Sequence, residues 1–390
     1  MSKKRIGIAV MALGMFLWAA AAYASPEAPR LLSPPMALPV PSGFLKVLLL
    51  LTFFVHLVLV NVLLGSVILS VIDRRASASD RKGGVAFMPK VLALAVNFGV
   101  APFLFLQVLY GHFLYPSIVL MAVWWMFVAL FAMLAYYGLY VSDGAVRPTR
   151  RTPILFLSAL LLLMTAFLLS NASTLMLRPD FWFRWFSEPH GHLLNTSDPT
   201  LFPRYLHILL ASLAVGGLTM AWRVRWSKRD PEVDRKRPSA VSPGLDWFFF
   251  DSLAQVPVGL LVLFTLPPDV RGLFLGGDAL STAALILAVS GLCIALILVR
   301  QGGLKLASTA ALGVILVMVC VRGMVRDAML QPYSGAASPA PTALAMPHGQ
   351  TAALSLFLVA TVLVVAVLVW LGRVLFHALN RSESSEIREG

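Results

Sequence analysis

Long apolar stretches alternate with short polar ones along most of the chain. A helix that spans a bilayer needs about 20 mostly apolar residues, and nine stretches beyond the N-terminal segment reach that length. They are residues 44–72, 85–111, 114–141, 153–177, 204–226, 246–267, 279–300, 303–323 and 349–378. Because backbone polar groups in lipid must be satisfied within the segment itself, we expect each stretch to form a helix.

Composition supports this interpretation. The chain is 59% hydrophobic and 13% charged, whereas soluble domains carry about 25% charged residues. Most of the net charge of +13 lies in short loops between apolar stretches, as membrane topology requires, so it does not indicate nucleic-acid binding. Cys293 and Cys320 both fall inside apolar stretches, which indicates neither a disulfide framework nor a zinc site. The expected fold class is an all-α, polytopic membrane protein.

The N-terminus has the features of a signal peptide. Residues 3–5 are basic, an apolar run follows, and residues 22–24 read Ala-Tyr-Ala, which is a typical cleavage pattern. We therefore expect residues 1–24 to be removed, and residues 25–43, which are rich in proline, to form an exported tether. The alternative is an uncleaved first span.

Basic residues indicate the orientation. Lys and Arg concentrate in the alternate loops 73–84, 147–151 and 223–237, and such loops normally lie on the cytoplasmic side. This places the mature N-terminus outside and the tail, residues 380–390, in the cytoplasm. The expected location is a bacterial inner membrane.

Two histidines stand out within the apolar stretches. His56 lies inside the first stretch and His207 near the start of the fifth. Ionisable residues within spans usually face the bundle interior and mark function, and neutral imidazole is a haem iron ligand. Small residues follow His207 and either leave room for a large flat ligand or serve close helix packing: Ala211, Ser212, Ala214, Gly216 and Gly217.

Other residues are weaker candidates. His112 and His348 lie near the outer ends of their stretches, and His190 and His192 form a His-Gly-His sequence in an outer loop. The outer side carries five arginines that either pair with haem propionates, which need cations, or extend their charged ends to the membrane interface. They are Arg178, Arg184, Arg204, Arg322 and Arg326. No stretch carries two histidines that would stack two haems on one helix.

Four collinear segments resemble subunit I of the cytochrome bd-type quinol oxidases. They are HLVLVNVLLG (56–65), NFGVAPFLFLQVLYG (97–111), SNASTLMLRP (170–179) and YLHILLASLAVGGL (205–218). The resemblance therefore covers residues from about 50 to 220. It implies a bd-like bundle with a five-helix half, residues 44–226, that carries the candidate haem ligands, and a four-helix half, residues 245–379.

The resemblance also implies roles for particular residues. It makes His56 the ligand of a high-spin haem and His207 a ligand of a low-spin haem b. It further implies quinol as electron donor, contact with membrane lipid, and a second membrane subunit.

The chain departs from the family at residues that deliver protons, at a ligand of the low-spin haem and at the loop that binds quinol. Gln107 stands where the family has a glutamate, and the third stretch contains no carboxylate. The seventh stretch lacks the methionine that would be the second ligand of the low-spin haem. Four residues could replace that ligand: His348, Met346, Met324 and His112. The loop that binds quinol in the family is short here, at residues 267–278.

Three functions follow from these observations. The first is a haem b-binding subunit of a respiratory electron-transfer complex that moves electrons between quinol and an exported partner such as a cytochrome c. In this reading Arg178 and Arg204 would hold propionates. The second is a transporter or metal-handling permease without haem, in which outer side chains collect copper: His190, His192, Met324, Met329, Met346 and His348. The third is a terminal quinol oxidase subunit that reduces oxygen.

Overall fold

The computed structural model describes residues 38, 40–72, 85–144, 148–227 and 243–333, together with scattered helical positions between 355 and 370. The chain divides into two units. One comprises residues 1–35 and 42–337, and the other comprises residues 36–41 and 338–390. The described helices of both expected halves up to Tyr333 belong to the first unit.

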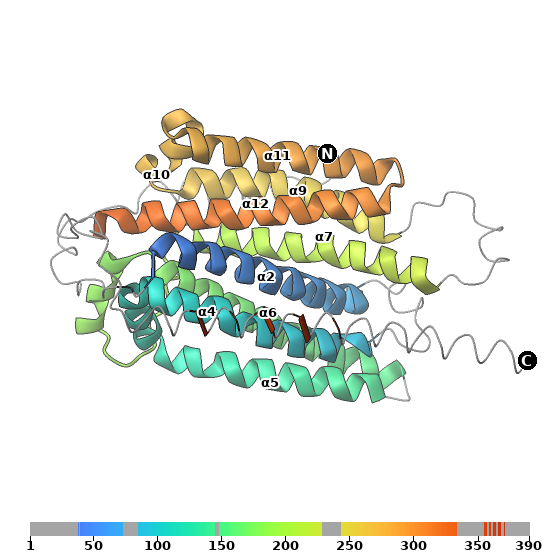
Figure 1. The fold of residues 1–390 in the computed structure, drawn as a ribbon. Coiled ribbons are helices and arrows are strands. Elements are labelled where there is room, and N and C mark those ends of the chain that lie inside the picture. Colours follow the sequence, from blue (N-terminus) through green and yellow to red (C-terminus); the bar gives the residue numbers. More distant parts are fainter. Residues whose placement is uncertain are drawn as a thin grey trace, which may run out of the picture. The chain divides into compact units, whose positions relative to one another are not determined.

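Eight long helices form the described part of the first unit (Figure 1). They are α2 (Ser42–Ile72), α4 (Phe87–Leu120), α5 (Ala122–Gly144), α6 (Pro148–Leu175), α7 (Leu201–Ser227), α9 (Pro243–Thr265), α11 (Ala279–Arg300) and α12 (Leu304–Leu330). Short helices complete the connections: η2 (Pro179–Phe186), α10 (Pro268–Gly272), η3 (Leu273–Gly277) and η4 (Gln331–Tyr333). Within the described residues every regular element is helical, as the sequence predicts.

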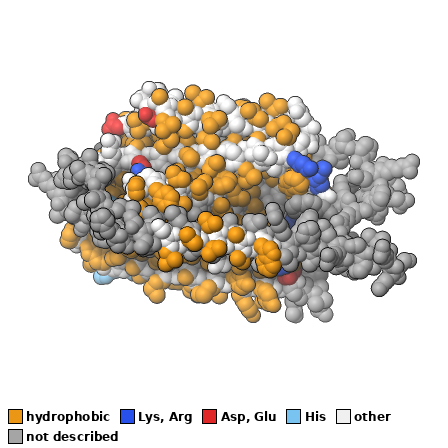
Figure 2. Space-filling view, viewed as in Figure 1, with side chains coloured by type: hydrophobic (Ala, Val, Ile, Leu, Met, Phe, Trp, Pro, Cys, Tyr) orange, Lys and Arg blue, Asp and Glu red, His pale blue; other side chains and the backbone are white. Residues whose placement is uncertain are grey.

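The outer surface of the helices is apolar. Hydrophobic side chains dominate the face shown in Figure 2, and charged side chains appear near its two ends. On α5, Met126, Met133 and Tyr137 are 75%, 62% and 67% exposed. Exposure of such a surface to water would be unfavourable, whereas lipid chains would solvate it. The eight helices therefore define a multi-pass membrane protein.

Helix α2 lies at the centre of the packing. It contacts α4, α6, α7 and α12, and its buried face carries Asn61 and the glycine Gly65. The Oδ1 atom of Asn61 accepts a hydrogen bond from the hydroxyl of Ser212 at 2.8 Å. Gly65 meets Gly216 of α7 backbone to backbone. Small residues thus bring α2 and α7 into close contact.

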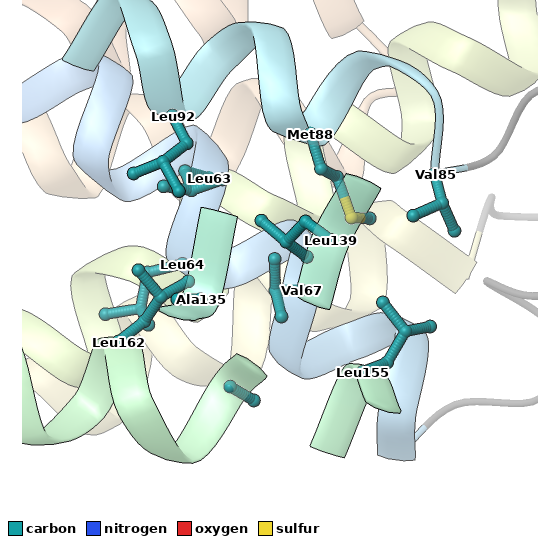
Figure 3. Packing of buried hydrophobic residues seen from close by; sticks show 11 residues of the cluster. Leu63, Leu64, Val67, Val85, Met88, Leu92, Ala135, Leu139, Leu155 and Leu162 are labelled. Carbon is teal, nitrogen blue, oxygen red and sulfur yellow. The ribbon is translucent and has the colours of Figure 1, made fainter. Parts of the chain in front are cut away.

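A buried cluster joins the half of α2 beyond Asn61 to its neighbours (Figure 3). Leu63, Leu64 and Val67 of α2 lie against side chains of α4, α5 and α6, including Met88 and Leu139. Val67, Met88 and Leu139 are inaccessible to solvent. This packing fixes the position of α2, which also carries His56.

Three predicted boundaries are wrong. The second stretch does not end at residue 111 and the third does not begin at residue 114, because α4 continues to Leu120 across a kink at Tyr110 and α5 begins at Ala122. Beyond residue 111, the ring of Phe113 is buried and lies 4.1 Å from that of His112, so this part of α4 is packed into the bundle. The eighth stretch does not end at residue 323, because α12 continues to Leu330. Asp327, expected in a loop, is paired with Lys46 of α2.

The remaining boundaries differ from prediction by a few residues, as helix ends commonly do. The ninth stretch, 349–378, is described only at scattered positions, which are helical. The signal peptide, most of the tether and the C-terminal tail lie outside the described residues. At the start of α11, the carboxylate of Asp278 accepts a hydrogen bond from the backbone N–H of Ser281 at 2.8 Å, which lowers the pKa of that carboxyl.

Candidate functional site

His56 is held in one orientation by the backbone of α4. Its Nδ1 atom lies 2.8 Å from the carbonyl oxygen of Ala95. A carbonyl accepts only, so Nδ1 carries the proton and donates, and the lone pair is left on Nε2. A hydrogen bond of this kind, from the ring nitrogen that does not bind metal, is the usual support of a metal-ligating histidine.

The imidazole of His56 lines a cavity of about 380 Å³ between α2, α4, α5, α6 and α12. Its walls are mostly aromatic and aliphatic, with Phe53, Phe103 and Trp125 among them. Arg322 and Arg326 supply its charges. This volume lies within the range of about 300–1,000 Å³ that is usual for ligand pockets.

Gly99 of α4 lies directly against the His56 ring. A Cβ atom at this position would lie 2.8 Å from Cε1 and 2.9 Å from Nδ1 of His56. Glycine is therefore required for the ring to occupy its present place beside Ala95.

We expect Gly99→Ala to displace the His56 ring while the helices stay packed, because the three atoms nearest to the added methyl group all belong to this side chain. Any group ligated by His56 should then bind at least tenfold more weakly, as follows when the support of a metal ligand is lost. A spectroscopic ligand titration measures the change. Gly313→Ala is the matched control, since its Cβ would meet nothing within 4 Å; equal affinity in the two variants would contradict the assigned role of Gly99.

His207 of α7 lines a second cavity, of about 210 Å³, between α2, α6, α7, α9 and α12. Its Nδ1 atom is buried and has no hydrogen-bond partner within the described part of the chain. The backbone of α9 approaches the ring at Gly259, where a Cβ would lie 3.5 Å from Cε1 of His207. A buried polar atom without a partner costs free energy, and water or a ligand that bonds to Nδ1 would lower this cost.

The small residues after His207 have two different roles. Only Ala211 lines the cavity. Gly216 packs against Gly65 of α2, and Gly217 packs against Gly244 of α9. Ala214 lies in the cluster shared with α9, α11 and α12. For most of these residues the close-packing interpretation is therefore the right one.

The two cavities are neighbours with common walls. Ser173 of α6 and Val319 and Arg322 of α12 line both of them. His56 and His207 therefore occupy adjacent cavities rather than opposite sides of a single one. Three arginines and no acidic residue occur in the two linings: Arg204, Arg322 and Arg326.

A polar cluster lies beside these cavities where α2 begins and α12 ends. The carboxylate of Asp327 accepts a hydrogen bond from the Tyr110 hydroxyl at 2.5 Å. It also forms ion pairs with Lys46 at 2.8 Å and with Arg326 at 3.2 Å. Arg326 also lies over the ring of Tyr110, 4.2 Å from its centroid. Sequence reasoning missed this cluster, because its members are far apart in the chain.

The other predicted site residues lie elsewhere. His112 and Gln107 of α4 line neither histidine cavity, and His112 packs on Phe113. Arg178 pairs with Asp180 at 3.2 Å and lines a third cavity, of about 480 Å³, at the junction of η2, α10 and η4. Arg204 does line the His207 cavity. His348 lies outside the described residues.

The copper-binding alternative finds no assembled site among the described residues, where no group of three His, Cys, Asp or Glu side chains could hold a metal ion. Met324 and Met329 pack in an apolar cluster on α12. His192 lies against the ring of Trp124, with 6.4 Å between ring centroids.

The donor set fits an iron porphyrin. Each cavity offers one imidazole from a helix, apolar walls and at least one arginine for a propionate. Haem proteins use the same kinds of group. The His207 cavity is smaller than the usual range, so its lining side chains would have to move to admit a porphyrin.

The fold and the cavities together define a multi-pass α-helical membrane protein with two histidine-lined internal cavities. Comparison with known proteins finds no similar protein family, no similar curated protein and no similar solved structure.

Proposed function

We propose that the chain is a haem b-binding integral membrane subunit of a respiratory electron-transfer complex, and that it moves electrons between membrane quinol and an exported redox partner. The observation that supports it most is the placement of His56 and His207, from α2 and α7, in adjacent cavities with common walls. Two sites that share residues are close enough for direct electron exchange.

Within this proposal the residues have distinct tasks. His56, supported by the Ala95 carbonyl, and His207 ligate iron, while the arginines in the linings face the propionates. Haem bound there supplies one-electron redox chemistry. The apolar walls keep water away from the sites and so influence their reduction potentials.

The charges of the linings favour electron transfer over oxygen reduction. Reduction of oxygen to water needs protons at a buried site, and ionisable side chains normally deliver them. The described residues that line the two cavities include no aspartate or glutamate. The proposed function therefore includes no reduction of oxygen.

The proposal also includes the topology and the partners. The basic loops face the cytoplasm of a bacterium, and the end of the bundle where α2 begins and α12 ends faces outward. There the η2 segment, which is rich in aromatic residues, offers a surface to an exported cytochrome c. A second membrane subunit covers part of the apolar exterior.

The test is anaerobic reduction by a quinol. The protein is expressed in a haem-competent bacterium, purified in mild detergent and mixed with a soluble reduced quinol, and absorbance and oxygen uptake are recorded in parallel samples. We expect haem reduction, reoxidation by added ferric cytochrome c, and no catalytic oxygen uptake. Rapid quinol-dependent oxygen uptake would instead identify a terminal oxidase. A folded protein without haem would overturn the proposal and leave a permease as the better assignment.

A further inference from the structure

Arg322 is the charged residue that the linings of the two cavities share. It lies on α12, and its side chain lines both the His56 and the His207 cavity. The residue is solvent-accessible, and it contributes to the lining of both cavities. A ligand in either cavity would therefore meet this group.

No counter-charge for Arg322 occurs among the described residues. Its recorded contact is with the ring of Phe53, whose centroid is 4.9 Å from the guanidinium carbon. Arg204 and Arg326 are close enough for their charges to repel that of Arg322. Arg326 follows four residues later on the same helix face, where like charges destabilise a helix. Arg326 has the carboxylate of Asp327 as its partner, whereas Arg322 has no carboxylate partner in the part of the chain that the structure describes.

A guanidinium inside a membrane protein without an anion is costly. The cavities beside Arg322 carry no acidic side chain that could neutralise it. Among the described residues nothing supplies this negative charge, and an anionic ligand in either cavity would supply it. Guanidinium groups recognise carboxylates through two parallel hydrogen bonds, so a carboxylate is the group that suits this position.

We infer that Arg322 binds a carboxylate of the ligand that His56 ligates, and that this contact selects ligands with a free carboxylate. Arg322 lines the His56 cavity and lies over Phe53, another residue of its wall. The inference rests on the proposed function, in which that ligand is an iron porphyrin with two propionates. Because the same guanidinium also lines the His207 cavity, one ionic contact connects the occupants of the two sites.

The test compares two probes on apo-protein in detergent: ferric protoporphyrin IX, and its dimethyl ester, in which both carboxylates are blocked. Binding is measured from the Soret band. We expect Arg322→Gln to weaken binding of the free acid about 10- to 100-fold, as for loss of a charged hydrogen bond, and to leave ester binding unchanged. Arg322→Lys should restore part of the affinity.

Arg300→Gln is the matched control, because Arg300 also lies over aromatic rings, those of Phe249 and Phe250, but lines neither cavity. It should bind both probes as the unmodified protein does. Ester binding also reports on folding, because it requires an intact cavity.

Two results would overturn the role of Arg322 and leave the proposed function intact. One is equal affinity of the unmodified protein for acid and ester, and the other is an equal loss of both probes in Arg322→Gln. Failure of the unmodified protein to bind either porphyrin would overturn the proposed function and, with it, this inference.

Discussion

The His207→Ala variant is expected to lose the low-spin b-type signal of the purified protein while it keeps its helices. The side chain is removed from a site where its Nδ1 atom already lacks a partner, so truncation costs little packing and removes one axial ligand. A low-spin haem needs two strong axial ligands, and loss of one abolishes its sharp α band. Visible spectra of the reduced variant and of the unmodified protein measure the effect.

The control is His112→Ala. That histidine lies on α4, packs on Phe113 and lines neither histidine cavity, so its removal should leave the spectrum unchanged. An intact α band in His207→Ala, or equal losses in the two variants, would show that His207 is not an iron ligand.

Gly216→Ala is expected to lower the stability of the helix bundle strongly. The new Cβ would lie 2.6 Å from the carbonyl carbon and 2.8 Å from the Cα of Gly65. Both contacts are with backbone, so no side-chain rotation relieves them, and α2 must move away from α7. Overpacking of this kind costs about 1–3 kcal/mol or more, and here it also separates the helices that carry His56 and His207.

Thermal unfolding in detergent, followed by circular dichroism, measures this loss. Gly313→Ala again serves as the control, because nothing lies within 4 Å of the added atom. It should be neutral or slightly stabilising, since alanine is the better helix former. If Gly216→Ala unfolds at the same temperature as the control, the close contact between α2 and α7 is not what holds them together.

The sequence predicts the helices well because the membrane leaves few alternatives. Backbone groups in lipid have to be satisfied within the helix, so length and apolarity are enough to locate all eight spans of the first unit. The errors occur where tertiary contacts keep a polar residue inside the bundle. Asp327 looks like a loop residue until Lys46, 281 positions away, is seen to pair with it.

The candidate site was predictable only in part. Residue type alone selects His56 and His207, because an ionisable side chain inside a span is costly and usually has a function. Spacing along the chain does not reveal that their cavities share Arg322, which follows from the packing of α12 against α2 and α7. Nor does it reveal which glycines serve packing and which serve the site: Gly216 contacts backbone, whereas Gly99 contacts a histidine ring.

The most direct test of the central claim is the reduced-minus-oxidised visible spectrum of the purified, folded protein. The account predicts sharp α and Soret bands of b-type haem, with no red-shifted chlorin band. A chlorin band would contradict the assignment to electron transfer and favour oxygen reduction. The absence of any chromophore from correctly folded protein produced in a haem-competent host would contradict haem binding itself.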